Sequence, residues 1–457
     1  MTNRLDRDFH LPGLLRFALP TIIMMLVVSL YTIVDGVLIA RLVGENALAA
    51  ANVAYPAISF TLAMGIMLGT GGSAVVAHKM GAGYLEEARR DFGFLALVAV
   101  CIGLAVCLAG ALFAGPLAQL LGASDLLLDD TVTYLRVQLC FAPMAMLQLL
   151  FESFFVTAGR PGLGLGLATA AGVTNAVLDY LYMGPMQMGI LGAALGTVTG
   201  YSIPAVVGVL FFLLRRQGLR FGRPHGDLRM LGRACFNGAS EMVTNLSMAV
   251  TTFLFNAIMM AYLGEAGVSA ITIVLYAQFL LVALYMGFSM GVAPVFSFNR
   301  GAGRYDRMRR IFGYCLRFIL VSSVAILAVA LALSGVVVGI FSTPGSQVYA
   351  IALDGFRRFA PAFLFAGVNI FSSALFTALS DGRTSAIISF ARTFGFLLLG
   401  LLLLPRLLEV DGVWLAVPLA ELLSCLLSVW FLRRKRADFG FGGGDLPRHG
   451  GRGGGRT

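Results

Sequence analysis

The stretch GAGYLEEARRDFG at residues 81–93 returns as GAGRYDRMRRIFG at residues 301–313, with the same glycines, paired arginines and closing Phe-Gly. The two copies are 220 residues apart, and the same offset aligns Thr157-Ala158 with Thr377-Ala378. Matches at one fixed offset over such a length indicate an internal duplication. The chain therefore consists of two related halves, and each copy of the motif is a basic loop between two apolar runs.

The composition places both halves in a membrane. Of the 457 residues, 58% are apolar and 12% are charged. Soluble domains carry about 25% charged residues, so a water-soluble fold is excluded. Twelve apolar runs are long enough for the ~20 residues that cross a ~30 Å hydrocarbon core, and none shows the two-residue period of a barrel strand. We therefore expect an all-α polytopic membrane protein with 12 transmembrane helices.

The twelve expected spans fall into two pseudo-symmetric six-helix lobes. Those of the first half are 14–40, 46–73, 91–116, 130–158, 162–183 and 187–214. Those of the second half are 234–262, 266–295, 311–341, 350–379, 384–405 and 411–433. The expected organisation is an N-terminal lobe at 1–214, a cytoplasmic linker at 215–233, a C-terminal lobe at 234–436 and a flexible Gly/Arg-rich cytoplasmic tail at 437–457. An even number of helices per half gives the lobes the same orientation, related by an axis along the membrane normal.

The basic excess, 33 Lys and Arg against 23 Asp and Glu, concentrates in every second loop. Because Lys and Arg stay on the cytoplasmic side during insertion, this pattern predicts that both termini are cytoplasmic. Arg41 and Arg406 are the clear exceptions. The excess is interpreted as a topological signal, so no nucleic-acid partner is expected. The first apolar run lacks a cleavage site, which predicts that it stays in the protein as a span.

Ionisable side chains inside the spans are the candidates for chemistry, because each costs at least a few kcal/mol in hydrocarbon. Asp35 lies in the 14–40 span, and Asp179 follows Asn175 by four residues, on the same helical face. Such an oxygen-rich group suits a proton or a Na⁺ ion. At the offset of the repeat Asp35 becomes Phe255, which indicates that one lobe carries the coupling site. The alternative is that these residues only form hydrogen bonds between helices.

Three further acids lie in expected spans. Glu152 could serve packing, and Glu241 and Glu421 are expected near a membrane interface. All three are secondary candidates for contact with a substrate. Prolines within the spans favour helix bends, and Pro20 stands out because it precedes Asp35 on one span.

Signatures of enzymes and of cofactor sites are absent from the sequence. The six cysteines have no CxxC spacing and are interpreted as packing thiols. No phosphate-binding loop of the P-loop type occurs, which argues against transport driven directly by ATP hydrolysis in this chain. The four histidines fall near or outside the ends of the spans (His10, His78, His225, His449). We expect a transporter with no cofactor and no structural metal, not an enzyme.

Several motifs in order resemble the multidrug and toxic compound extrusion (MATE) family. They are the repeated Gly-Ala-Gly loop with trailing Arg-Arg, the segment Asn175-Ala-Val-Leu-Asp179, and Gly189-Ile-Leu-Gly-Ala-Ala194. The resemblance covers nearly the whole chain except the tail and is closest to the DinF-like branch of bacterial multidrug exporters. It implies a first-lobe site for H⁺ or Na⁺ made of Asp35, Asn175, Asp179, Thr197 and Tyr134. Glu241 matches only half of the acidic pair that the other major branch carries in its second lobe.

The function that the resemblance implies is secondary antiport. The protein would export amphipathic, cationic organic compounds or drugs in exchange for H⁺ or Na⁺, as a monomer in the bacterial cytoplasmic (inner) membrane. Bending of the first helix near Pro20 would link the ion site to the substrate cavity. The alternative is a flippase for lipid-linked oligosaccharide or peptidoglycan precursors, which belongs to the same superfamily. A cavity lined by Arg136, Arg357 and Arg358 would favour that alternative.

Overall fold

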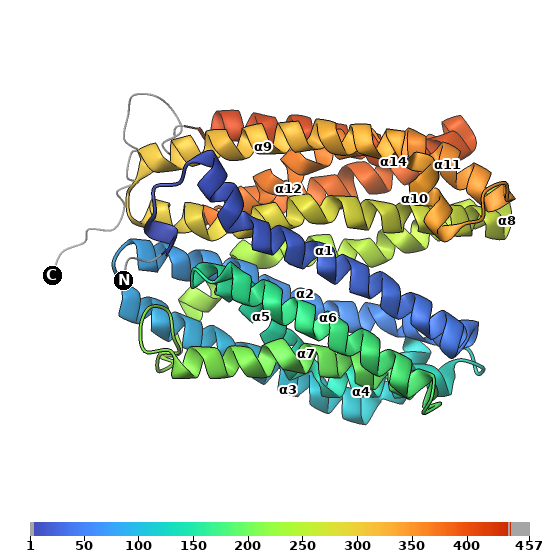
Figure 1. The fold of residues 1–457 in the computed structure, drawn as a ribbon, viewed down its shortest axis with the longest axis horizontal. Helices are drawn as coiled ribbons and strands as arrows, with labels where there is room; N and C mark the ends of the chain where they lie inside the picture. Colours follow the sequence, from blue (N-terminus) through green and yellow to red (C-terminus); the bar gives the residue numbers. More distant parts are fainter. Residues whose placement is uncertain (1–3, 437–438, 440–457) are drawn as a thin grey trace.

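The computed structural model describes residues 4–436 and Phe439, and every regular element in them is helical. Figure 1 shows two stacked layers of long helices, one from each half of the chain, with α1 running obliquely between them. The tail expected at 437–457 lies outside the described residues, apart from Phe439.

The first half contains one span that is broken into two helices and five spans that are single helices, one of which is kinked at Phe113. Its elements are η1 (Arg4–Asp6), α1 (Leu11–Leu42), α2 (Glu45–Gly81), α3 (Leu85–Leu120), α4 (Leu128–Cys140), α5 (Ala142–Thr157), α6 (Pro161–Met183) and α7 (Gly189–Leu214). The span expected at 130–158 is broken between α4 and α5, whose axes differ by 55°. Pro143 stands at the start of α5, where its missing N–H and its ring disfavour a continuous helix.

The second half repeats this plan. Its elements are α8 (Leu228–Gly301), α9 (Tyr305–Ala332), α10 (Ser334–Phe341), α11 (Gln347–Phe359), α12 (Ala362–Ala378), α13 (Gly382–Phe390), the π-helical η2 (Ala391–Leu397) and α14 (Leu398–Arg434). α11 and α12 are bent by 56° at Pro361, as α4 and α5 are at Pro143. The span expected at 311–341 is interrupted at Leu333, where α9 gives way to α10.

Two of the expected loops are sharp reversals of the chain within α8 and α14, each of which is assigned as one helix. Gly264 in α8 has φ 62° and Glu409 in α14 has φ 51°, a left-handed region that glycine enters freely and glutamate does not. Eight helices in the described chain are long and apolar enough to cross a membrane, and the two bent pairs raise the number to ten. Dividing the chain at Gly264 and Glu409 then recovers the twelve expected spans.

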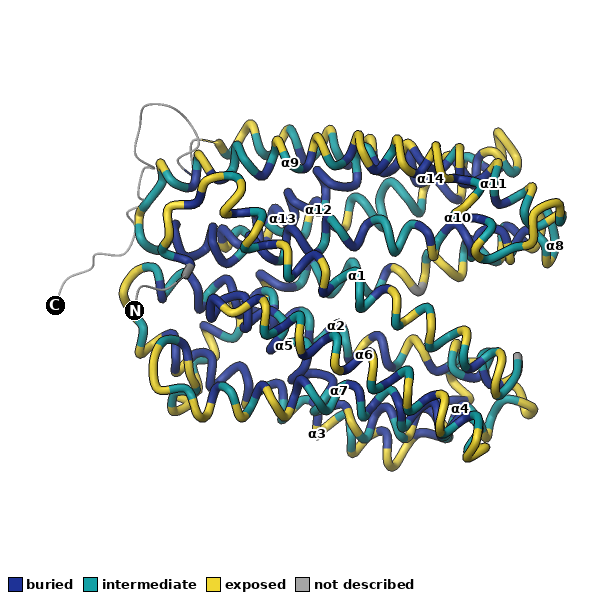
Figure 2. Tube along the Cα trace, viewed as in Figure 1, coloured by how far each residue is buried: buried dark blue, intermediate teal, exposed yellow. Residues whose placement is uncertain are grey.

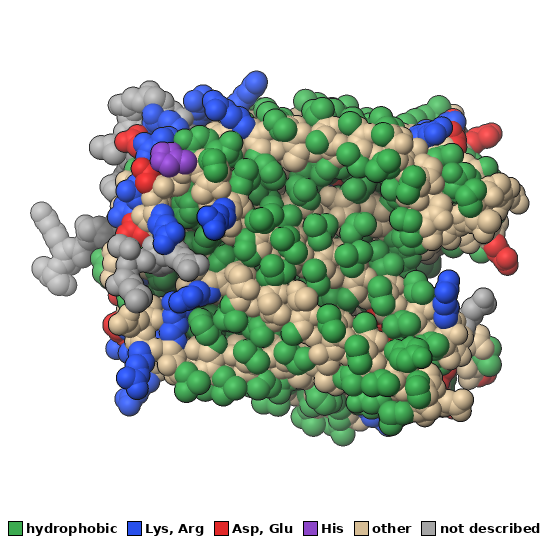
Figure 3. Space-filling view, in the orientation of Figure 1, with side chains coloured by type: hydrophobic (Ala, Val, Ile, Leu, Met, Phe, Trp, Pro, Cys, Tyr) green, Lys and Arg blue, Asp and Glu red, His purple; other side chains and the backbone are tan. Residues whose placement is uncertain are grey.

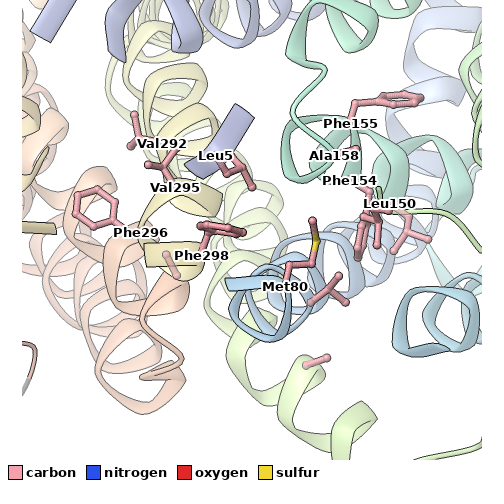
Figure 4. Close-up of a cluster of buried hydrophobic side chains, with 14 of the residues drawn as sticks. Leu5, Met80, Leu150, Phe154, Phe155, Ala158, Val292, Val295, Phe296 and Phe298 are labelled. Carbon is pink, nitrogen blue, oxygen red and sulfur yellow. The ribbon is translucent and has the colours of Figure 1, made fainter. Parts of the chain in front are cut away.

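One end of the molecule gathers most of the Lys and Arg side chains, whereas a broad apolar belt surrounds the middle (Figure 3). We call this the basic end. It carries η1, where Arg304 forms an ion pair with Asp6 and Arg310 with Asp8. It also carries the contact of Lys435 with Asp381. The side chains buried here come from both halves, among them Met80 of α2, Phe298 of α8 and Leu5 of η1 (Figure 4).

The two halves touch through glycines at the basic end. A Cβ atom on Gly81 would overlap the carbonyl oxygen of Phe298, and one on Gly301 would overlap that of His78. Gly81 and Gly301 are the first residues of the two copies of the repeated motif. The duplicated sequence therefore supplies both sides of the point where α2 and α8 cross.

A second set of glycine contacts lies deeper in the membrane. Cβ atoms on Gly71 and Gly238 would overlap carbonyl oxygens of Ala234 and Met67, which joins α2 to the start of α8. The repeat-related contact joins the later part of α8 to α1, where a Cβ on Gly291 would lie 3.1 Å from that of Ala18. The first span of each half thus packs on the second span of the other.

Beyond these contacts the halves separate. Phe60 lies two helical turns from Met67 on the same face of α2 and is 50% exposed. Met248, on the face of α8 that holds Ala234 and Gly238, is 48% exposed. The tube in Figure 2 is buried mainly toward the basic end, and the surface is indented between the halves at the opposite end (Figure 3). A cleft therefore opens away from the basic end.

We expect Gly301→Ala to lower the melting temperature of the purified protein, because the added methyl group would force α8 away from α2. Overpacking of this kind costs on the order of 1–3 kcal/mol. The control is Gly232→Ala, also in α8, where no atom lies within 4 Å of the added group and alanine is the better helix former. Equal melting temperatures for the two variants would contradict the close approach at Gly301.

Candidate functional site

Four helices bring the five expected first-lobe residues together. Asp35 comes from α1, Tyr134 from α4, Asn175 and Asp179 from α6, and Thr197 from α7. The carboxyl groups of Asp35 and Asp179 interact with each other. The side chain of Tyr134 interacts with both of these carboxyl groups and with Thr197.

Glycines allow these helices to approach closely enough. A Cβ atom on Gly196 of α7 would overlap Oδ1 of Asp179, and one on Gly200 would lie 3.3 Å from Cβ of Asn175. On the other side of α6, a Cβ on Gly172 would lie 2.7 Å from the ring of Tyr31 on α1. Small residues at helix contacts are the usual means of close packing in membranes, and here they close the wall around the carboxyl groups.

Four polar atoms of Asp35, Asn175 and Asp179 lack hydrogen-bond partners within the described chain, whereas the hydroxyl of Thr197 donates to the carbonyl of Ala193. Asp179 is 0% exposed and Asn175 is 4% exposed. Both carboxylate oxygens of Asp179, Oδ1 of Asp35 and Nδ2 of Asn175 are buried without a hydrogen bond. A buried polar group without a partner is costly, and two neighbouring carboxylates also repel each other. The arrangement is chemically suited to take up a proton or a small hard cation between Asp35 and Asp179.

Glu152 lies in a second polar group of the same lobe. Its Oε1 accepts a hydrogen bond of 3.1 Å from Nε2 of Gln148 on α5, and its charge interacts with Tyr31. Tyr31 precedes Asp35 by one turn of α1. The group therefore adjoins the Asp35 and Asp179 pair and extends the acidic wall of the first lobe.

The second lobe holds a buried ion pair that the sequence did not lead us to expect. Arg392 lies at the start of η2, and its Nη2 is 2.6 Å from Oε1 of Glu421 on α14. Asn369 on α12 donates a hydrogen bond of 2.6 Å to Oε2 of Glu421 and accepts one of 3.0 Å from Ser428. Both charges are thus satisfied inside the lobe.

This network places Glu421 in the interior of the second lobe. Glu421 is 4% exposed and fully engaged. The missed signal was Arg392 itself, a charged residue within the apolar run 384–405. It lies in the only π-helical stretch of the described residues, and such stretches often occur at functional sites.

Glu241 lies on α8 within electrostatic reach of Arg392, and no hydrogen bond engages its carboxylate within the described chain. It follows Ala234 by seven residues, two helical turns, so it shares the face that meets α2. Because the contact with α2 ends near Gly238, Glu241 stands at the bottom of the cleft.

Pro20 lies inside α1, which stays helical on both sides of it. Its neighbours Ala18 and Ile22 pack against Gly291 and Gly287 of α8, whereas Tyr31 farther along packs on α6 of the first lobe. α1 therefore contacts both halves, the second half around Pro20 and the first half around Asp35.

Two of the three arginines that would favour a flippase are already engaged. Arg358 contacts Asp354 and Asp411, and Nε of Arg357 donates a hydrogen bond of 3.2 Å to Ser334. These contacts leave little free positive charge for a pyrophosphate at this end of the second lobe.

Comparisons with known proteins agree on one family. The MatE family matches residues 20–181 and 242–402, one match in each half. The multidrug export protein MepA of Staphylococcus haemolyticus is 23% identical over 428 residues, covering 92% of each chain. MepA of Staphylococcus saprophyticus is 24% identical over 439 residues, covering 92% of this chain and 94% of the relative.

Solved structures share the fold. A crystal structure of a MATE protein in complex with MaL6 superposes with a TM-score of 0.88 at 18% identity, covering 93% of this chain and 96% of the other. An outward-facing conformation of a multidrug resistance MATE family transporter of the MOP superfamily has a TM-score of 0.87 at 18% identity, with the same coverage. The expected fold of 12 helices in the MATE arrangement is thereby confirmed.

We expect Arg392→Leu to destabilise the protein strongly, because it leaves Glu421 buried without its counter-charge. Breaking such a pair costs about 3–5 kcal/mol, so the melting temperature in detergent should fall. The double variant Arg392→Leu with Glu421→Leu should recover much of the loss. Arg358→Leu breaks a half-exposed pair instead and should change stability by about 1 kcal/mol or less. A double variant no more stable than the single one would contradict the pairing.

Proposed function

The chain belongs to the MatE family, and we propose that it is a secondary antiporter that exports amphipathic, cationic organic compounds in exchange for H⁺ or Na⁺. As a member of that family it is a membrane transporter rather than an enzyme. The observation that carries the proposal is the pair Asp35 and Asp179, two neighbouring carboxyl groups in which Oδ1 of Asp35 and both oxygens of Asp179 are buried without a hydrogen bond. The names of the staphylococcal relatives support multidrug compounds as the substrates.

The proposed coupling group is Asp35, Asn175, Asp179, Thr197 and Tyr134. Uptake of a proton or Na⁺ by Asp35 and Asp179 would remove the repulsion between their charges and draw α1 toward α6. A bound organic cation would favour the opposite state, because it is attracted by the ionised carboxylates. Antiport requires that the two ligands favour different states in this way.

We propose that α1 transmits this change to the cleft. Its later part carries Asp35 against the first lobe, and its earlier part packs on α8 of the second lobe. Pro20 lies in this earlier part, and its missing N–H removes one helical hydrogen bond and lowers the resistance to bending. A movement of Asp35 would thus bend α1 near Pro20 and reshape the cavity between the lobes. Glu241, at the bottom of the cleft, is a second acidic group that the substrate would meet.

The proposed orientation places the basic end in the cytoplasm. Lys and Arg gather there, and the positive-inside rule then makes both termini cytoplasmic. The cleft opens at the opposite end, so the described state is outward-open. We propose that the protein acts as a monomer in the bacterial inner membrane, with lobes at 1–214 and 234–436 joined by the linker at 215–233.

A flippase for lipid-linked oligosaccharide or peptidoglycan precursors is the less favoured alternative. It would need a cationic cavity for a pyrophosphate. The charges nearest the bottom of the cleft are instead acidic or internally paired, namely Glu152, Glu241 and the pair of Arg392 with Glu421. An organic cation fits this balance of charge better than a pyrophosphate.

We expect Asp35→Asn and Asp179→Asn each to abolish ion-driven export, because the amide can neither release a proton nor balance a cation. The measurement is ethidium transport by purified protein in liposomes, with pH and Na⁺ gradients imposed separately. A pH gradient alone driving transport would identify H⁺ as the coupling ion, and a Na⁺ gradient alone would identify Na⁺.

The control for these variants is Asp125→Asn, which removes a carboxylate from the loop between α3 and α4 and should leave transport unchanged. If Asp35→Asn and Asp179→Asn, matched for the amount of protein, export ethidium at the full rate, the coupling site is elsewhere.

A further inference from the structure

We propose that the beginning of α9 carries a binding site for the phosphate of an anionic phospholipid in the leaflet at the basic end. The site is a cavity of about 300 Å³ lined by Arg309, Arg310, Gly313, Tyr314 and Arg317. Every lining group is a cation, a phenol or a glycine. Neither the coupling ion nor the exported compound explains this cavity, because it lies on the outside of the second lobe.

Two donors of the cavity, those of Arg317 and Tyr314, are available to a ligand. Arg317 is exposed, and within the described chain neither its guanidinium nor the hydroxyl of Tyr314 has a hydrogen-bond or ion-pair partner. Arg310 contacts Asp8 at 3.0 Å, but both side chains of this pair are about half exposed, and such pairs contribute little. Guanidinium groups bind phosphate oxygens through parallel hydrogen bonds. A phosphate can therefore bridge Arg310 and Arg317.

The cavity lies at the edge of the hydrocarbon. Arg310, Tyr314 and Arg317 share one face of α9 with Val321 and Val324, which are 70% and 59% exposed. Exposed apolar residues continue from Leu320 to Ile340 of α10, a length of about 30 Å as helix, which matches the hydrocarbon core. Arg317 thus stands where lipid phosphates lie, and Figure 3 shows basic side chains bordering the apolar belt at this end.

The internal repeat shows that the cavity is particular to the second half. The positions equivalent to Arg310, Tyr314 and Arg317 are Arg90, Phe94 and Leu97 on α3. The equivalent of Gly313 is Gly93, where the carbonyl of Gly222 from the linker takes up the space of a Cβ. At Gly313 no atom lies within 4 Å of an added Cβ. The linker fills the groove of the first half, whereas the groove of the second half is open and more basic.

The balance of charge favours an anion. Among the described residues, Asp8 contacts Arg310, and Asp306 lies one helical turn before Arg310 on α9. Neither lines the cavity, whereas three arginines do. A phosphatidylglycerol headgroup provides one negative charge and a lipid tail that the apolar face beyond Arg317 can accept, and basic pockets at the cytoplasmic side of membrane helices typically bind such lipids.

The test is lipid retention by the purified full chain in neutral detergent, measured by native mass spectrometry with phosphatidylglycerol or phosphatidylcholine. Phosphatidylglycerol should be retained and should raise the melting temperature, whereas phosphatidylcholine should do neither. Arg317→Ala should lower phosphatidylglycerol retention about five-fold, the effect expected of one basic residue near the surface. Arg317→Lys should keep most of the retention, and Gly313→Leu should lower it by filling the cavity.

The matched control is Arg90→Ala, which removes the repeat-related arginine of the first half and should leave retention unchanged. Equal retention of the two lipids, or an equal loss in Arg90→Ala and Arg317→Ala, would overturn the proposal. Inorganic phosphate that raises the melting temperature as much as phosphatidylglycerol does would show a site for free anions and would also overturn it. If Arg317→Ala does not fold, the comparison of Arg317→Lys with Gly313→Leu decides the outcome.

Discussion

The cost of an unpaired charge in hydrocarbon is the constraint on which the structure depends. The two lobes satisfy this constraint in opposite ways. In the second lobe Arg392 neutralises Glu421, and Asn369 and Ser428 complete the hydrogen bonds around the pair. In the first lobe Asp35 and Asp179 face each other with no cation of the protein between them. The charge that the first lobe lacks is the charge that an ion from outside can supply.

The arrangement in each lobe requires helix backbones to approach one another closely. Gly196 and Gly200 let α7 approach α6 so that α7 packs against the buried carboxyl group of Asp179, and Gly81 and Gly301 let the halves meet at the basic end. Backbone contacts of this kind contain no ion pair that must be broken. At these glycine contacts, separation of the halves costs packing alone, whereas the ion pairs of Asp6 with Arg304 and of Asp8 with Arg310 also join the halves at the basic end.

The sequence predicted what depends on local composition. Long apolar runs and the repeated motif were enough for twelve spans in two halves, and the four-residue spacing placed Asn175 and Asp179 on one face. Thr197 and Tyr134 followed only from the family resemblance, because nothing local links them to Asp35. The ion pair of Glu421 was not predicted, since its partner Arg392 comes from a different span and pairing between spans is a tertiary property. The break at Leu333 was missed because the apolar run continues across it.

The two lobes differ in how their buried charges are paired, and this difference suggests different roles for the two halves of the duplicated fold. A second lobe whose ion pair is satisfied in place has no electrostatic reason to change when an ion arrives, so it can act as a fixed frame. In the proposed mechanism the first lobe changes its charge balance when an ion binds, and α1 carries Asp35 of that site while it also packs on α8 of the second lobe. Duplication gives two equivalent scaffolds. Phe255 stands where the first half has Asp35, and Arg392 pairs with Glu421, so the second scaffold is suited to support the movement proposed for the first.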